Sequence, residues 1–518
     1  MSAKWLKNTV FYEIYPQSFN DTNGDGIGDF EGIIQKLDYI ADLGCNALWI
    51  NPCYDSPFKD AGYDVRDYKK VAPRYGTNDD LYRLFEEAHK RDIHVLLDLV
   101  PGHTSEEHEW FRMSQKAEKN EYSDRYIWTD FCFAPAAGHP YVGGESERSG
   151  TYVLNFFKCQ PALNYGFLNP TEPWQLPMNH PEALATREAI KDIMRFWLSH
   201  GCDGFRVDMA SSLVKNDDDN KSGTSAIWRD IRRMLDLEYP DAAMVAEWSA
   251  PKLALRAGYD MDFYLNEPGN GYSTLMRDYK NHENADYSFF KKNAGGNINR
   301  FLDEYLDWYE DTKDLGYISM LTCNHDTLRP KYSLDDDELK LAYAFIFTMP
   351  GVPFLYYGDE IGMRYLELPT KEGGYFRTGS RTPMQWDNGK NLGFSNADAG
   401  KLYLPVDPAK DAPTVESQEK TPDSLLNTVK ALLRLRHDNE DLQSDAYLKI
   451  ICSETGKPFV YKRGALLIAI NPCGNECNVS IGDTVTSSLA SEPVFVIGKG
   501  SLINGTLAMG AQSFAVFK

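Results

Sequence analysis

Eight short apolar runs, separated by segments of helical periodicity, constrain the fold of this 518-residue chain most strongly. Each run has the length and composition of a strand that is buried on both faces of a parallel sheet. Helices between the runs are indicated by apolar residues at i, i+3 and i+7, as at Leu81, Leu84 and Ala88. A strand that alternates eight times with a helix predicts an α/β fold, the (β/α)8 TIM barrel. The expected strands are Val10–Tyr15, Ala47–Asn51, Val95–Val100, Gly204–Met209, Ala243–Trp248, Asp262–Leu265, Tyr317–Thr322 and Pro353–Tyr357.

Two stretches fall outside this alternation. Residues 104–174 carry Gly, Pro and aromatic side chains without a sustained helical period, which predicts a B domain inserted after the third strand. After the helix-like run Ser424–Arg436, short β-type runs separated by Gly and Asn predict a C-terminal β-sandwich at residues 438–518. The barrel would then consist of residues 1–103 and 175–437.

The net charge and the lack of a recognisable targeting signal limit the kinds of partner and the cellular location that we expect. A net charge of -22 and a pI near 4.9 disfavour nucleic acid and anionic membranes as partners. The uncharged stretch Leu341–Gly358 is interrupted by Pro350 and Gly351, so it is interpreted as a buried helix, a turn and a strand rather than a membrane span. The first residues lack an apolar segment of signal-peptide length, and the nine cysteines do not suggest a disulfide framework. We therefore expect a cytoplasmic protein, with monomer and dimer both left open.

Four segments place a carboxylate or an imidazole where an expected strand ends. They are Asp98-Leu-Val-Pro-Gly-His103, Gly204-Phe-Arg206-Val-Asp208, Ala246-Glu247-Trp248 and Asn324-His325-Asp326. The last residues of neighbouring barrel strands converge at the mouth of the barrel, so these groups would share one pocket. Retaining cleavage of a sugar–sugar bond needs a carboxylate nucleophile and a protonated carboxylic acid about 5 Å away. The segments therefore predict an enzyme that cleaves glycosidic bonds.

The local charge environment suggests a role for each acid. Arg206 lies two residues before Asp208 on the same strand face, so we expect it to keep Asp208 ionised as the nucleophile. Glu247 follows an apolar run, which would keep a proton on it and make it the acid/base. Asp326 would steady the positive charge that develops in the transition state. The alternative is an ion-pair network that only stabilises the barrel mouth.

These segments, together with three further motifs, resemble the α-amylase family of retaining glycoside hydrolases. The further motifs are Asp60-Ala-Gly-Tyr63-Asp64, Gln160-Pro-Ala-Leu-Asn164 and Arg381-Thr-Pro-Met-Gln-Trp386. The nearest likeness is to the branch of oligo-1,6-glucosidases, α-glucosidases, trehalose synthases and sucrose isomerases, and it covers nearly the whole chain. The resemblance implies a catalytic barrel with B and C domains, and it implies Asp208, Glu247 and Asp326 as nucleophile, acid/base and transition-state stabiliser.

The same resemblance implies a set of substrate-binding residues. Tyr63 would stack on the glucosyl ring, and His103, Arg206 and His325 would hydrogen-bond its hydroxyls or the nucleophile. Asp60 and Arg381 match positions that hold the non-reducing-end hydroxyl in exo-acting members. If these two residues meet, the pocket is closed at that end and single glucosyl units are released.

One loop is expected to bind a structural calcium ion. Oxygen ligands and glycines alternate along residues 21–29, as they do in calcium-binding loops, although the closing glutamate of an EF-hand is missing. A metal-free Asp/Gly turn is the alternative. A second calcium site between the barrel and the B domain is doubtful, because Gly102 replaces the side-chain oxygen that amylases use there. By the family resemblance, the ligands of the first site would be Asp21, Asn23, Asp25, the Ile27 carbonyl and Asp29.

The leading hypothesis is an exo-acting α-glucosidase that acts on short α-gluco-oligosaccharides. A glucosyltransferase or isomerase would use the same acids, and an endo-acting amylase is a third reading. A non-catalytic partner of amino-acid transporters would lack the acids and carry a membrane span, which disfavours that reading. The residue after the nucleophile position is Met209, which leaves the choice between α-1,4 and α-1,6 linkages open.

Overall fold

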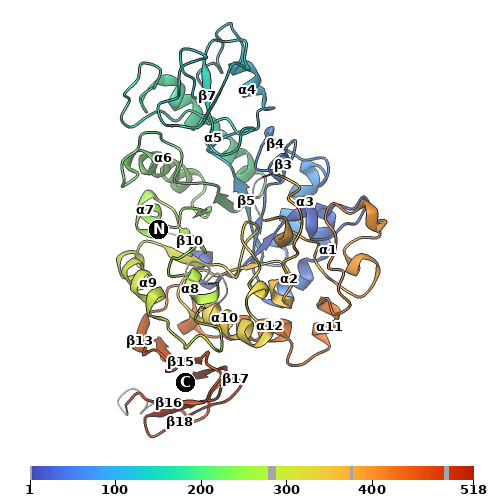
Figure 1. Ribbon diagram of the computed structural model, residues 1–518, viewed down its shortest axis with the longest axis vertical. Helices are drawn as coiled ribbons and strands as arrows, with labels where there is room; N and C mark the ends of the chain where they lie inside the picture. Colours follow the sequence, from blue (N-terminus) through green and yellow to red (C-terminus); the bar gives the residue numbers. More distant parts are fainter. Residues whose placement is uncertain (1–2, 278–286, 374–376, 483–488) are drawn as a thin grey trace.

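A closed barrel of parallel strands forms the centre of the protein (Figure 1). The computed structural model describes residues 3–277, 287–373, 377–482 and 489–518. The strand order is β11-β10-β9-β8-β5-β2-β1-β12, and a parallel bridge between Leu321 and Phe354 joins the two ends of this sheet. The predicted fold class is confirmed, and each expected run overlaps one strand. These strands are β1 Phe11–Ile14, β2 Ala47–Ile50, β5 His94–Leu99, β8 Gly204–Val207, β9 Ala243–Ala246, β10 Met261–Tyr264, β11 Tyr317–Met320 and β12 Phe354–Tyr356.

The barrel strands are apolar because both of their faces are buried. Every residue of β1, β2, β8, β9, β10 and β12 is buried. Alternate residues fill the barrel interior, where Phe11 and Phe354 stack with their ring centroids 4.3 Å apart and Trp49 packs beside them. The other residues of each strand face the surrounding helices in a second, larger cluster. This two-sided burial explains why the runs show no polar alternation.

Amphipathic helices surround the barrel. Helix α3 (Asn78–His89) begins with a capping box between Thr77 and Asp80 and buries the predicted stripe that contains Leu81 and Ala88. Helix α12 (Leu425–His437) begins at the N-cap Ser424, where its run was predicted to start. The other helices are α1 Phe30–Gln35, α2 Leu37–Leu43, α4 Glu109–Ser114, α5 Pro181–Ser199, α6 Ser222–Glu238, α7 Pro251–Ala254, α8 Ser273–Met276, α9 Asn299–Thr312, α10 Asp336–Thr348 and α11 Val415–Glu419.

The segment between β5 and β8 forms an insert with a small core of its own. It contains α4 and the hairpin of β6 (Tyr141–Gly143) and β7 (Thr151–Val153), and its apolar cluster includes Ile127 and Phe167. The insert lies at one end of the long axis, opposite the C-terminal strands (Figure 1). A second small hairpin, β3 (Tyr54–Asp55) with β4 (Asp67–Val71), follows β2. The exact boundaries of the domains stay a prediction.

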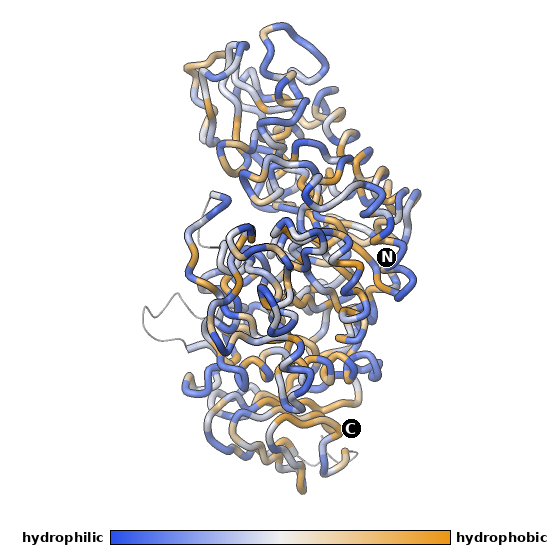
Figure 2. The backbone as a smooth tube through the Cα atoms, turned by 90° about the vertical axis from the view of Figure 1, so that its right-hand side faces the viewer, coloured by the Kyte–Doolittle hydropathy of each residue, from blue (hydrophilic) through white to orange (hydrophobic). Residues whose placement is uncertain are grey.

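The C-terminal strands form two packed sheets, as predicted. One sheet has the order β13-β14-β15-β20-β17 and the other the order β16-β19-β18. Apolar side chains of both sheets, among them Leu467 and Leu507, meet in one cluster. Figure 2 shows hydrophobic stretches in the strands beside the C-terminus. The strands are β13 Leu448–Cys452, β14 Phe459–Arg463, β15 Leu466–Asn471, β16 Cys477–Ser480, β17 Phe495–Ile497, β18 Gly500–Ile503, β19 Thr506–Met509 and β20 Ser513–Phe517.

The long uncharged stretch near the end of the barrel belongs to its core. Helix α10 ends at Thr348, the chain turns at Gly351, and β12 follows, so the predicted helix, turn and strand are present. Within the described ranges, no helix is both long and apolar enough to cross a membrane. All nine cysteines are free thiols. The cytoplasmic location stays a prediction.

Candidate active site

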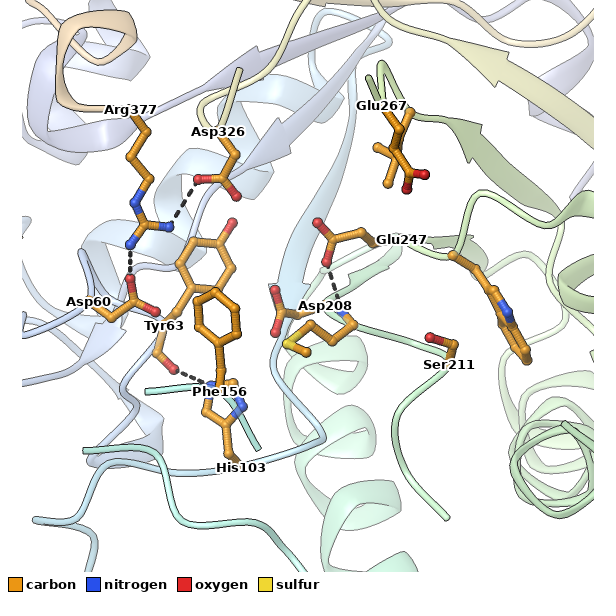
Figure 3. A pocket seen from close by; sticks show the side chains of 13 residues that line it. Asp60, Tyr63, His103, Phe156, Asp208, Ser211, Glu247, Glu267, Asp326 and Arg377 are labelled. Atoms are coloured by element: carbon orange, nitrogen blue, oxygen red, sulfur yellow. Dashed lines mark hydrogen bonds and ion pairs between the residues drawn. The ribbon is translucent and has the colours of Figure 1, made fainter. Parts of the chain in front are cut away.

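A pocket of about 270 Å³ lies at the carboxyl ends of the barrel strands (Figure 3). Asp208 follows β8 directly and Glu247 follows β9 directly, while Asp326 comes from the loop after β11. All three predicted acids therefore line one pocket. The complete lining is Asp60, Tyr63, His103, Phe156, Asp208, Met209, Ser211, Glu247, Trp248, Leu265, Glu267, Asp326 and Arg377.

A single guanidinium holds the acids of β5, β8 and β9 together. Arg206 Nη1 lies 2.7 Å from Asp98 Oδ1 and 3.1 Å from Asp208 Oδ1. Its Nη2 lies 2.8 Å from Glu247 Oε1. Because one planar group contacts both Asp208 and Glu247, these two carboxyl groups lie side by side (Figure 3). Arg206 is itself buried behind the pocket, so it positions the acids from below.

The turn after β8 orients Glu247 further. Met209 has a φ of 42°, in the left-handed region that a side chain with a Cβ rarely adopts. This turn points the Met209 amide at the acid/base candidate, and its N–H donates to Glu247 Oε2 over 2.8 Å. The sequence analysis treated Met209 only as a possible indicator of linkage. Its backbone role could not be found from the sequence, because no residue type signals it.

The charge environment of the two central acids differs from the prediction. Burial and the negative charge of Glu247 raise the pKa of Asp208, and these effects outweigh the nearby Arg206. Arg206 therefore favours the ionised form of Asp208, as predicted, but it does not set the pKa of Asp208 by itself. Glu247 does not lie in apolar surroundings either, since Arg206 and the Met209 amide occupy both of its oxygens.

The pKa of Asp326 is shifted in the opposite direction, downward. Burial alone would raise the pKa of Asp326, but the positive groups around it, with His325, hold this pKa below its usual range. Arg381 Nη2 lies 2.7 Å from Asp326 Oδ1 and Arg377 Nη1 lies 3.1 Å from the same oxygen. These contacts keep Asp326 ionised in the pocket.

An ion pair between Asp60 and Arg377 bounds one end of the pocket. Gln160 Nε2 also donates to Asp60 Oδ2 over 2.6 Å. Burial raises the pKa of Asp60 to about 6, although Arg377 opposes this shift. Asp60 and Arg381, which the family resemblance assigns to the same sugar hydroxyl, do not meet as an ion pair. Arg381 is buried behind the pocket and pairs instead with Asp326 and, over 2.9 Å, with Glu372.

Tyr63 and His103 line this end of the pocket, and His325 is fully buried beside Tyr63. The Tyr63 hydroxyl lies 2.6 Å from His325 Nε2 and donates to Asp98 Oδ2 over 3.0 Å. His103 Nε2 lies 3.2 Å from the Tyr63 carbonyl, and burial lowers the pKa of His103 to about 3. Burial lowers the pKa of His325 as well. Both imidazoles are therefore neutral at pH 7, which suits hydrogen bonding to hydroxyl groups rather than to anions.

Glu13 is a further buried group that the sequence analysis missed. It lies in β1, and His325 Nδ1 is 2.8 Å from its Oε1. This contact fixes the orientation of His325 and hence of Nε2 beside Tyr63. A carboxylate inside an otherwise apolar strand was the available signal. Seven lining residues were also not predicted as site residues: Phe156, Met209, Ser211, Trp248, Leu265, Glu267 and Arg377.

The predicted calcium loop lies before α1 and away from the pocket lining. Asp21 accepts hydrogen bonds from the Gly24 and Gly26 amides, both over 2.8 Å, and Asp29 caps α1 by accepting from Gly32. The described part of the chain contains no group of three or more His, Cys, Asp or Glu side chains placed to hold a metal ion. Calcium binding would therefore need the amide oxygen of Asn23 and the Ile27 carbonyl in addition to carboxylates.

The arrangement defines a class of protein. A TIM barrel whose mouth gathers two adjacent carboxyl groups, a third ionised carboxylate and neutral hydrogen-bonding groups is built to break or transfer glycosidic bonds. The chain belongs to the α-amylase family, since the model of the alpha amylase catalytic domain matches residues 13–445. The predicted resemblance to this family of glycoside hydrolases is thereby confirmed.

Relatives within the family carry several activities in their names. The chain is 34% identical to the trehalose synthase/amylase TreS of Mycolicibacterium smegmatis, over 84% of this chain and 77% of that protein. It is 31% identical to an oligo-1,6-glucosidase of Heyndrickxia coagulans, over 90% of this chain and 92% of that protein. The crystal structure of isomaltulose synthase from Erwinia rhapontici NX5 superposes with a TM-score of 0.82 at 26% identity and covers 99% of both chains.

Proposed function

We propose that the protein is an exo-acting, retaining α-glucosidase that releases glucose from short α-gluco-oligosaccharides. The observation that supports this proposal most is the Asp60–Arg377 ion pair, which lines the same pocket as Asp208, Glu247 and Asp326. In the proposed enzyme this pair closes one end of the pocket. A closed end admits a chain terminus but not the middle of a polymer. The relatives named as oligo-1,6-glucosidases support this reading, and the closed end disfavours an endo-acting amylase.

In the first step, Asp208 attacks the anomeric carbon while Glu247 donates a proton to the leaving glycosidic oxygen. A bound substrate would place this oxygen beside Glu247 and the electron-poor carbon beside Asp208. These contacts favour a proton on Glu247 and the negative charge on Asp208. Asp326, which stays ionised between Arg377 and Arg381, would stabilise the oxocarbenium-like transition state.

In the second step, Glu247 accepts a proton from water as the water oxygen attacks the same carbon. The bond between this carbon and Asp208 breaks, which returns the carboxylate and releases α-glucose. Two displacements from opposite faces leave the configuration unchanged. Glu247 is protonated again at the end, so the pair recovers the single proton with which it began.

Glucosyl transfer or isomerisation is the second candidate. The relatives named trehalose synthase and the fold match to isomaltulose synthase favour it. The same covalent intermediate would then be attacked by a sugar hydroxyl in place of water. The roles of the three acids would not change.

A substrate panel tests the proposal. Maltose, isomaltose, sucrose and trehalose are each incubated with the protein, and the first products are followed by proton NMR. Free glucose that appears first as the α-anomer supports the proposal. New disaccharides with little free glucose would favour transfer or isomerisation, and β-glucose as the first product would contradict retention.

We also propose that the loop of residues 21–29 binds one structural Ca²⁺ through Asp21, Asn23, Asp25, the Ile27 carbonyl and Asp29. The spacing of oxygen atoms along the loop supports this proposal. The test compares melting temperatures in excess Ca²⁺ and in EDTA. Asp25→Ala should abolish the difference, because Asp25 is exposed and its side chain otherwise accepts only from the Ile27 amide. An equal melting temperature in both buffers would reject the site.

A further inference from the structure

One carboxylate of the pocket has no role in the two displacement steps. Glu267 follows β10 and lines the pocket. No hydrogen bond or ion pair of its side chain is found among the described residues, and the group is largely exposed to the pocket. Burial and the charge of Glu304 raise the pKa of Glu267. An unpaired carboxylate at this position is available to a ligand.

The position of Glu267 assigns it to the leaving-group side. The glucosyl ring would occupy the closed end, where Asp60 and Arg377 lie. Glu247 protonates the leaving oxygen, so the leaving group lies beyond Glu247. Glu267 lies on this side, away from Asp60 and Arg377, with its carboxyl group directed into the pocket (Figure 3).

The charges of the pocket are distributed unevenly along its length. Arg377 is the cation of the lining, and it is already paired with Asp60 and Asp326. The leaving-group side offers Glu267, Trp248 and Leu265, with no positively charged side chain in the described lining. A phosphate or carboxylate on the leaving group would therefore face Glu267 without a compensating cation. If the two like charges come within about 6 Å of each other, their repulsion at an effective dielectric of about 40 reduces binding about ten-fold.

We propose that Glu267 determines leaving-group specificity: it accepts hydrogen bonds from uncharged or cationic leaving groups and excludes anionic ones. Sugars that carry a phosphate ester or a uronic acid next to the scissile bond are then poor substrates. This inference rests on the proposed glucosidase function, because it uses the assignment of the closed end to the glucosyl ring.

The test uses three phenyl α-glucosides whose para substituents are neutral, anionic and cationic. The substituents are a carboxamide, a carboxylate and a trimethylammonium group, and kcat/KM is measured for each with the full chain and with Glu267→Gln. The wild type should prefer the carboxamide to the carboxylate by about ten-fold or more after correction for intrinsic leaving-group reactivity. Glu267→Gln should raise the carboxylate-to-carboxamide ratio by about ten-fold. Added salt should raise the same ratio in the wild type, since it screens the repulsion.

The same substitution at exposed Glu86 on α3 is the matched control, and it should leave the ratio as in the wild type. A ratio that Glu267→Gln does not change would overturn the inference while the glucosidase proposal stands. Failure of the wild type to release glucose from any of the three substrates would instead overturn the proposed function, and this inference with it. Circular dichroism melting of each variant confirms that the compared proteins are folded.

Discussion

In the proposed function, exo-action depends on the Asp60–Arg377 pair, and a double-mutant cycle measures the energy of this contact. The variants are Asp60→Asn, Arg377→Met and the double variant. Both side chains are only 3% exposed. Removal of one partner from a buried pair costs about 3–5 kcal/mol when the other partner stays charged. Asp60 can avoid this cost, because its pKa is already about 6 and protonation at pH 7 costs about 1.4 kcal/mol.

Arg377→Met should therefore lower the free energy of unfolding by only about 1–2 kcal/mol at pH 7. The difference in the free energy of unfolding between the wild type and Arg377→Met should grow as pH rises. The folded-state pKa of Asp60 lies above its unfolded value, so the contribution of this group to stability is present at low pH and falls as pH rises. Without Arg377 the pKa rises further, and each pH unit then costs up to about 1.4 kcal/mol. Urea denaturation at pH 6, 7 and 8 measures this trend.

For activity, each single variant removes charge-assisted hydrogen bonds to the terminal sugar, worth about 2–3 kcal/mol, or about 30- to 150-fold in kcat/KM. The double variant should fall little further than the singles, because the two groups act as a unit. If the fold-losses in kcat/KM of the two single variants multiplied in the double variant, the two groups would act independently, which would refute the reasoning. A loss of stability near 5 kcal/mol that does not vary with pH would refute the protonation argument.

Two further predictions concern the nucleophile and a buried histidine. Asp208→Asn should lower kcat by about 10⁴-fold or more with an unchanged circular dichroism spectrum, and near-normal turnover would remove Asp208 from the mechanism. Burial lowers the pKa of His108 from 6.5 to about 3. The neutral side chain therefore contributes its full stabilisation above pH 6.5, and this stabilisation is lost progressively as pH falls from 6.5 toward 3. His108→Asn keeps a cap for α4. Between pH 6.5 and 5 its free energy of unfolding, measured by urea denaturation, should fall by about 1–2 kcal/mol less than that of the wild type. His180→Asn, which alters the same capping contact on α5 at a less buried site, is the control, and an equal effect in both variants would contradict this account.

The barrel could be predicted from sequence because its strands carry a strong and simple signal. A strand buried on both faces must be apolar throughout, so Val95–Val100 was found within one residue of β5. The convergence of Asp208 and Glu247 followed from topology alone, since both come directly after a strand. These are consequences of chain connectivity and burial, and they do not depend on side-chain detail.

The finer features of the site depend on three-dimensional packing and were not predictable. Arg377 and Arg381 lie four residues apart, and only the path of the loop decides which of them reaches Asp60. The pKa of Asp208 depends on its burial and on Glu247, which is distant in sequence. The position of Arg206 two residues before Asp208 in the sequence was therefore not enough to predict the charge state of Asp208.

The central claim is that Asp208 forms a covalent bond to the glucosyl group, and labelling measures this directly. The protein is incubated with a fluorinated α-glucosyl fluoride, which slows hydrolysis of the intermediate, and is then digested and analysed by mass spectrometry. The account predicts one added fluoroglucosyl group on the peptide that contains Asp208, and its absence in Asp208→Asn. A label on another residue, or turnover of the reagent to an inverted product without any label, would contradict it.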